Sequence, residues 1–265
     1  MKYNNYRIAI ELALRDGLAL RQYNYIDNDD SVRVSFLVVG AGRGPLVRAA
    51  LAAVKNVNNK RFVISSPDEK LLLSPKLVPE IIAVEKNPSA ALYLSSLKLS
   101  GEVEWECVHV IQCDGRDLGL AASGLINKGE RQGSRHLRHP ALVRMAKSHH
   151  ADLVVSELLG SFGDNELSPE CINGVETSGL LRPDGKCVFI PKRYWSLLAP
   201  VSSSRLWAEG NYLISAFIVT IVANSSNRFS SSISFIYIVA QTQSYMASNT
   251  LEGPCGVGFP IRGLF

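Results

Sequence analysis

The chain of 265 residues has few cysteines and no long apolar run. None of its five cysteines stands in a C-x-x-C pair or in a spacing typical of disulfide frameworks, so we expect reduced thiols and no cysteine-based metal site. No apolar run reaches the ~20 residues of a membrane helix. The first residues contain no apolar segment of a signal peptide, and we therefore expect a soluble intracellular protein with no membrane contact.

Two nucleotide-binding patterns are also missing. The sequence has no G-x-x-x-x-G-K-[ST], which excludes a phosphate-binding P-loop. A dinucleotide fingerprint would need a third glycine five positions after Gly40, where this chain has Pro45, and no catalytic Tyr-x-x-x-Lys pair follows. A nicotinamide-dependent dehydrogenase is therefore a weak alternative.

What the chain does contain is a β-rich apolar run, 32–39, that leads into a glycine turn and then an alanine-rich helix. Gly40 and Gly42 allow the backbone to come close to a ligand, and Pro45 suits the first position of the helix. The N-terminus of that helix favours an anionic group. The remaining common ligand of such a turn is S-adenosylmethionine, which presents a carboxylate rather than a pyrophosphate.

Acidic residues follow the next two apolar runs. Glu85 ends the run 81–85, where it is placed to accept hydrogen bonds from ribose hydroxyls, and Asp114 with Gly115 follows the run 108–113, where it is placed near an adenine edge. Each is equally compatible with an ordinary strand-end carboxylate. Their order along the chain nevertheless predicts an open α/β sheet that binds ligands at the carboxyl ends of its strands.

Two further glutamates, Glu157 and Glu166, lie nine positions apart after the buried-strand pattern 151–155. From Glu157 to Leu181 the chain has five acidic residues and no lysine or arginine, although the whole protein carries a net charge of +4. Two carboxylates at a strand end suit a planar cation, because a guanidinium offers its N–H donors in a fork. On its own the pair is also compatible with an acidic surface loop that caps a helix.

In combination these motifs resemble the protein arginine methyltransferases, and most closely the type II branch that makes symmetric dimethylarginine. Four segments carry the resemblance, and the third of them is specific to that branch: 40–47, 83–88, 156–171 and 199–206. The resemblance implies a Rossmann-like class I S-adenosylmethionine-dependent methyltransferase sheet over residues 1–209. We expect it to be a parallel-rich sheet with helices on both faces up to about residue 190.

The resemblance also implies roles for individual residues. Glu157 and Glu166 are expected to be catalytic, gripping the substrate guanidinium while the methyl group of S-adenosylmethionine passes to an arginine ω-nitrogen. The residues expected to bind the cofactor are Lys2, Tyr3, Gly40, Gly42, Pro45, Glu85, Asp114 and Gly115. The expected substrates are Gly-Arg-rich proteins of the histone or splicing-factor type, which places the protein in the cytoplasm and nucleus. A homo-oligomer is left open, and direct binding to nucleic acid is not expected, because the basic residues are scattered.

Two expected insertions, 60–79 and 118–149, interrupt the pattern. The second is basic, with six lysines and arginines between Lys128 and Lys147 against one acid. A group of histidines that is compatible with a metal site lies within or just after it: His136, His139, His149 and His150. No cysteine or carboxylate stands nearby at ligand spacing, so we expect no metal but a solvated loop that contacts partners or serves nuclear import.

The C-terminal residues 210–265 do not follow the resemblance. They contain two β-rich apolar runs, 213–222 and 233–240, and none of the motifs of the family's C-terminal β-barrel. We expect a β-rich tail that is either a remnant of that barrel or unrelated sequence. The family's large N-terminal barrel is not in this sequence either, so its WD-repeat partner is not expected to bind this chain. The alternative to an enzyme is thus a catalytically inactive methyltransferase-like module that binds cofactor or partners only.

Overall fold

The computed structural model describes residues 2–20, 22–25, 30–65, 71–101, 103–118, 139–160, 166–201 and 236–244. The helices of this part are α1 (Lys2–Ala19), α2 (Pro45–Asn59), α3 (Pro88–Leu99), η1 (Val103–Trp105), η2 (Gly115–Asp117), α5 (Pro140–Lys147) and α6 (Ser168–Glu176). The strands are β1 (Asn24–Tyr25), β2 (Ser31–Val39), β3 (Val63–Ser65), β4 (Leu71–Leu73), β5 (Lys76–Glu85), β6 (Val108–Gln112), β7 (Leu153–Ser156), β8 (Val188–Ile190), β9 (Arg193–Val201) and β10 (Ile236–Ser244). None of these helices has both the length and the apolar character that a membrane span requires.

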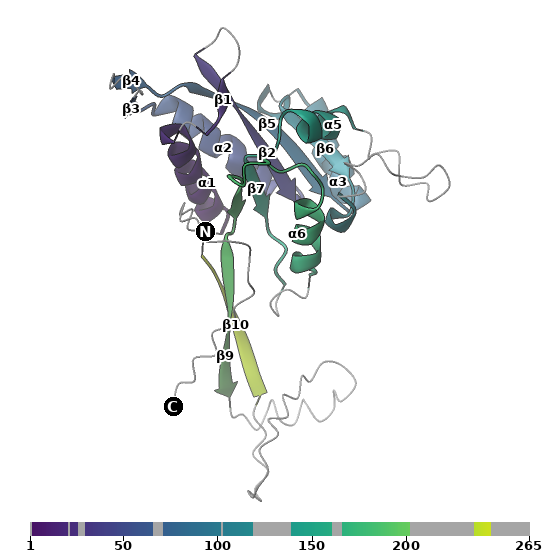
Figure 1. Cartoon of the computed structure of the whole chain (residues 1–265). Helices are drawn as coiled ribbons and strands as arrows, with labels where there is room; N and C mark the ends of the chain where they lie inside the picture. Colours follow the sequence, from purple (N-terminus) through teal and green to yellow (C-terminus); the bar gives the residue numbers. More distant parts are fainter. Residues whose placement is uncertain are drawn as a thin grey trace, which may run out of the picture.

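A mostly parallel sheet organises the described part of the chain (Figure 1). Its strand order is β6-β5-β2-β7-β8, and the short β1 adds to β2 in antiparallel orientation. The order therefore runs outward from β2 in both directions, as in the doubly wound α/β folds. The predicted Rossmann-like sheet is confirmed, and the carboxyl ends of β2, β5, β6 and β7 meet at one edge.

Helices cover both faces of this sheet, as the sequence predicts. Alternate residues of a strand point to opposite faces, so β2 contributes Phe36 and Val38 to one hydrophobic cluster and Leu37 and Val39 to the other. The first cluster includes buried residues of α1 and α2, and the second includes those of α5 and α6. Figure 1 shows these two pairs of helices on opposite sides of the strands.

The starts of α2 and α3 follow from local sequence. Pro45 occupies the first turn of α2, and Gly44 before it has a left-handed backbone. Asn87 caps α3, because its side-chain oxygen accepts hydrogen bonds from the N–H groups of Ser89 (2.9 Å) and Ala90 (3.3 Å). Both helix starts were predicted, and they place two helix N-termini directly after the carboxyl ends of β2 and β5.

The structure shows which parts of the two expected insertions belong to the sheet and the core. Strand β5 begins at Lys76 and pairs with β2 from its first residue, and among the described residues before it the β3–β4 pair forms a separate sheet. Within 118–149, Leu118 and helix α5 belong to the hydrophobic core, while 119–138 lie outside the described residues. The basic composition of 128–147 concealed the amphipathic pattern of α5, whose apolar side is buried.

Strands β9 and β10 form a separate antiparallel pair, with Ile236 opposite Val201 and Ser244 opposite Arg193. Residues 236–240 of one apolar run of the predicted tail thus lie in a strand, and its partner strand comes from the region before residue 209. The other run, 213–222, lies outside the described residues. The domain boundary at residue 209 stays a prediction.

The packing of α5 gives a stability prediction. Leu142 is 1% exposed and Val143, its neighbour on the same helix, is 42% exposed. Leu142→Ala should lower the free energy of unfolding by about 2–5 kcal/mol, because it leaves a cavity against the sheet. Val143→Ala should change it by no more than about 0.5 kcal/mol. Denaturant unfolding measures both, and equally small losses would contradict a core position for α5.

Candidate functional site

The glycine turn after β2 contains three glycines with left-handed backbone and is hydrogen-bonded to β5. Gly40, Gly42 and Gly44 have φ values of 72°, 54° and 88°, a region that favours glycine. The N–H groups of Gly40 and Ala41 both donate to the carbonyl of Val84 at 3.0 Å. The turn is thereby fixed to the end of β5.

The three glycines differ in what a side chain would meet. A Cβ at Gly44 would lie 2.9 Å from Leu94 and 3.0 Å from Trp105, and one at Gly40 would lie 2.7 Å from Leu158. A Cβ at Gly42 would meet no atom of the described residues within 4 Å. A side chain at Gly44 or Gly40 would therefore have to displace a neighbouring side chain, whereas Gly42 borders open space.

Glu85 joins the glycine turn to the start of α3. Its Oε2 accepts a hydrogen bond from the N–H of Gly42 (2.7 Å), and its Oε1 accepts one from the N–H of Asn87 (2.7 Å). The residue is 8% exposed. A carboxylate has about four lone-pair sites, so two protein donors leave capacity for hydroxyl donors of a ligand.

Glu157 lies against the same turn from the other side. It follows β7 directly, and its carbonyl oxygen lies 3.8 Å from the Cβ position of Gly40. Its carboxylate forms an ion pair with Lys2, with Nζ 2.7 Å from Oε1. The side chain of Glu157 is 20% exposed and that of Lys2 is 44% exposed. The structure thus brings together one expected catalytic residue and one expected cofactor-binding residue.

The start of α1 is held at this edge by a residue that sequence reasoning missed. The buried hydroxyl of Tyr6 donates to the carbonyl of Ser156 at 2.7 Å. Lys2 lies one turn earlier on the same helix face, since residues four apart align along a helix. Tyr3, which is 42% exposed, has its ring 5.8 Å from the Lys2 ammonium. The i, i+4 spacing of Lys2 and Tyr6 predicts only that they share a face of α1, not that this face meets the end of β7.

Asp114 caps η2 and forms an ion pair with Arg116. The guanidinium donates to both carboxylate oxygens, at 3.0 and 2.8 Å, and the backbone N–H of Arg116 donates as well. The hydrogen bond from the Arg116 side chain lowers the pKa of Asp114 despite partial burial. The carboxylate therefore stays ionised and orients the chain that follows β6.

Gly115 has a packing role of its own. A Cβ there would lie 3.0 Å from Val39 and 3.2 Å from Cys171 of α6. A Cβ at Gly174, on the same helix, would lie 2.4 Å from the carbonyl oxygen of Gly115. These two glycines let α6 approach η2 at backbone distance, so α6 is held beside the predicted cofactor pocket.

The two cysteines near this edge do not provide a nucleophile. Burial raises the pKa of Cys113 to about 12 and raises that of Cys171 above its usual value. A thiol must ionise to attack, so both remain protonated at neutral pH. The chemistry of the site therefore rests on carboxylates and cations.

Glu166, the second expected catalytic residue, is exposed and lies just before α6. No hydrogen bond or ion pair connects it to another residue in the described ranges, and 161–165 between it and Glu157 lie outside them. Leu167, which follows it, has a φ of 63°, a left-handed value that is uncommon for a leucine. A facing arrangement of the two glutamates stays a prediction.

One member of the predicted histidine group, His149, contacts a carboxylate away from the glycine turn. It lies with Glu80 at the opposite end of the sheet, where its Nδ1 is 2.7 Å from the carboxylate and its Nε2 is 3.0 Å from Arg33. Burial alone would raise the pKa of Glu80, but hydrogen bonds from Arg144 and His149 lower it overall. His136 lies outside the described residues, and the described ones contain no metal-binding group of histidines, cysteines and carboxylates.

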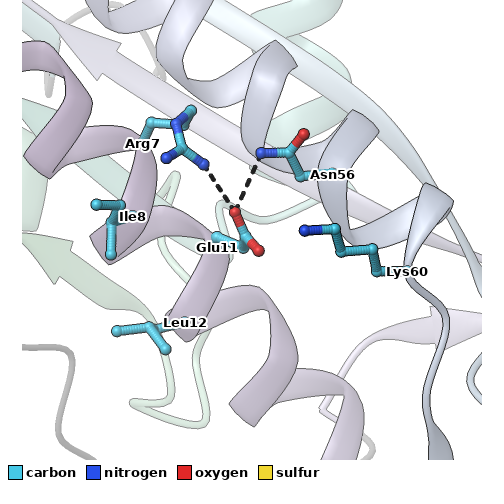
Figure 2. Close-up of a pocket in the computed structure, with 6 residues that line it drawn as sticks. All are labelled: Arg7, Ile8, Glu11, Leu12, Asn56 and Lys60. Atoms are coloured by element: carbon cyan, nitrogen blue, oxygen red, sulfur yellow. Dashed lines mark hydrogen bonds and ion pairs between the residues drawn. The ribbon is translucent and has the colours of Figure 1, made fainter.

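A groove of about 360 Å³ lies between α1 and α2, away from the glycine turn (Figure 2). Figure 2 shows Arg7 and Asn56 directed toward Glu11, which accepts hydrogen bonds from both at 2.9 and 3.2 Å. Ile8, Leu12 and Lys60 complete its lining. None of the predicted site residues lines this groove.

A parallel sheet with a glycine turn after its central strand and an acidic residue at the end of the neighbouring strand is typical of Rossmann-like folds, among them the S-adenosylmethionine-dependent methyltransferases. Within this class, the chain belongs to the PRMT5 arginine-N-methyltransferase family, whose sequence profile matches residues 1–188.

Curated relatives agree with this assignment. The chain is 36% identical to protein arginine N-methyltransferase 5 of Oryza sativa subsp. indica over 208 residues, which are 78% of this chain and 23% of the relative. It is 33% identical to the Xenopus laevis protein of the same name over 210 residues, 79% of this chain and 24% of that protein. A solved Trypanosoma brucei PRMT1 enzyme–prozyme complex with AdoHcy is similar at 15% identity and a TM-score of 0.42, over 78% of this chain and 44% of that one. The chain therefore spans about a quarter of the length of these curated relatives.

The open space at Gly42 gives a binding prediction with a matched control. Gly42 and Gly185 both have left-handed backbones, and a Cβ at either would meet nothing within 4 Å. Alanine should cost about 1–2 kcal/mol of stability at each position. Only Gly42→Ala should also weaken binding of S-adenosylhomocysteine, because the methyl group of the new alanine would occupy the space of the ligand. Calorimetric titration measures this difference, and equal affinities for the two variants would remove Gly42 from the site.

Proposed function

We propose that this chain is the methyl-transferring part of a protein arginine methyltransferase that uses S-adenosylmethionine. The observation that carries the proposal is the position of Glu157, which holds a cation at 2.7 Å beside the glycine turn. A carboxylate that already binds an ammonium there suits the guanidinium of an arginine. Membership of the family supports the same reaction.

The residues of the site fit the proposed cofactor. Gly42 borders open space, Glu85 retains acceptor capacity for ribose hydroxyls, and Lys2 offers a half-exposed ammonium for a carboxylate. We propose that Tyr3, Gly40, Pro45, Asp114 and Gly115 complete the cofactor pocket by shaping its walls. When bound, S-adenosylmethionine supplies an electrophilic sulfonium methyl group.

The protein's own contribution is positioning and charge. Glu157 and Glu166 would hold the guanidinium so that one ω-nitrogen lies in line with the methyl group, at near-attack distance. Their negative charge would draw the positive charge away from that nitrogen and keep its lone pair available. One of the two would then accept the proton that the methylated nitrogen loses.

The finer assignments belong to the same proposal. We propose residues 1–209 as the methyltransferase domain and arginine-containing proteins as substrates, with symmetric dimethylation as the product. The second candidate is a module that binds cofactor without turnover. It is favoured by the exposed position of Glu166.

The glutamate pair gives the test of the enzyme. Glu157→Gln and Glu166→Gln keep the size of each side chain but replace an acceptor oxygen with a donor. Each should reduce methylation of a Gly-Arg-rich peptide by roughly 100-fold or more, the range for losing one preorganised electrostatic contact. The two losses should not add in the double variant, because both residues act on one substrate group. Radiolabelled methyl transfer measures these rates.

Each variant should still bind S-adenosylhomocysteine in a calorimetric titration, which shows that the cofactor pocket is intact. Glu170→Gln on the exposed side of α6 is the control and should methylate at the unsubstituted rate. Undiminished methylation by Glu157→Gln would contradict the proposed role. Cofactor binding by the unsubstituted chain without any methyl transfer would favour the binding module.

A further inference from the structure

Lys2 lies on α1 one turn before Tyr6 and on the same face of the helix. Its side chain is 44% exposed, so a constraint is needed to hold its ammonium group at the glycine turn.

The constraint visible in the structure is Glu157. The two side chains form an ion pair at 2.7 Å, and Tyr6 fixes their relative position, because its hydroxyl binds Ser156, the residue next to Glu157. Tyr6 is fully buried, so the helix start cannot shift freely along the strand end. The ammonium of Lys2 is therefore held within reach of one carboxylate oxygen.

The proposed function makes two further demands on this ion pair. The carboxylate end of S-adenosylmethionine needs a cation, and Lys2 provides one at the glycine turn. The substrate guanidinium needs the carboxylate of Glu157, which Lys2 already neutralises. A guanidinium that binds both carboxylate oxygens needs the Oε1 that Lys2 holds, so Lys2 and the guanidinium compete for this oxygen of Glu157. Glu157 and the cofactor carboxylate likewise compete as anions for Lys2.

We propose, on the basis of the proposed function, that Lys2 is a positioning residue that couples the two substrates. Binding of the cofactor carboxylate draws Lys2 away from Glu157 and leaves this glutamate free to accept the guanidinium. The arginine site is then complete only when the cofactor's amino-acid end is in place. By thermodynamic linkage the coupling is reciprocal, so an arginine peptide tightens cofactor binding by the same factor.

The first experiment needs no arginine substrate. S-adenosylhomocysteine and its decarboxylated analogue are titrated into the 265-residue chain and into Glu157→Gln by calorimetry. Removing the competing anion should tighten binding of S-adenosylhomocysteine roughly fivefold or more and leave the decarboxylated analogue unchanged. In the Lys2→Gln, Glu157→Gln double variant the gain should vanish, and both ligands should bind as they do to Lys2→Gln alone.

The control is a second ion pair of the same length that lies away from the site. Lys55 and Glu104 are also 2.7 Å apart, and both are largely exposed. Glu104→Gln should leave the affinities of both ligands unchanged. An unchanged ratio of the two affinities in Glu157→Gln would overturn the coupling.

The second experiment measures the arginine side. A Gly-Arg-rich peptide should bind the unsubstituted chain roughly fivefold or more tightly with S-adenosylhomocysteine than with the decarboxylated analogue. Lys2→Gln should abolish this difference, and Lys2→Arg, which keeps the charge, should preserve most of it. Equal peptide affinities with the two ligands in the unsubstituted chain would sink the proposal.

Failure of the proposed function looks different from failure of the coupling. If neither adenosine ligand binds the unsubstituted chain, the proposed cofactor site is wrong. If both ligands bind with the same affinity to every variant, the cofactor site stands and the role of Lys2 is refuted.

Discussion

The geometry of the candidate site depends on one buried carboxylate. Glu85 accepts the N–H of Gly42 with one oxygen and the N–H of Asn87 with the other, so it ties the glycine turn to the start of α3. Leaving either donor unpaired in a buried position would cost on the order of 1–3 kcal/mol. The ends of β2 and β5 are therefore fixed relative to each other before any ligand is considered.

The fold and the positions of several candidate-site residues were predictable from the sequence, because their signals are local. Glycine, proline and acidic residues stand at the ends of apolar runs, and parallel strands bring those ends to one edge. The starts of α2 and α3 lie where Pro45 and Asn87 predicted them. For this reason Gly42, Glu85 and Glu157 were recognisable as neighbours although more than a hundred positions separate the first from the last.

Contacts between distant side chains were not predictable in the same way. The Lys2–Glu157 ion pair and the Tyr6–Ser156 hydrogen bond join α1 to a strand about 150 positions later, and no spacing rule connects such residues. Helix α5 was missed for another reason. Its buried residues belong to a segment whose overall composition is basic. Composition counts the solvent-facing residues of an amphipathic helix together with the buried ones, so it does not reveal the buried face.

The close approach of Gly115 and Gly174 has a consequence for how this protein can change during evolution. A side chain at Gly174 would collide with the backbone of Gly115 and Arg116, and one at Gly115 would press on the side chains of Val39 and Cys171, so both positions restrict how α6 packs on η2. A change of Gly174 therefore shifts α6 on η2, whereas exposed positions of the same helix, such as Glu170, can vary during evolution without loss of this contact.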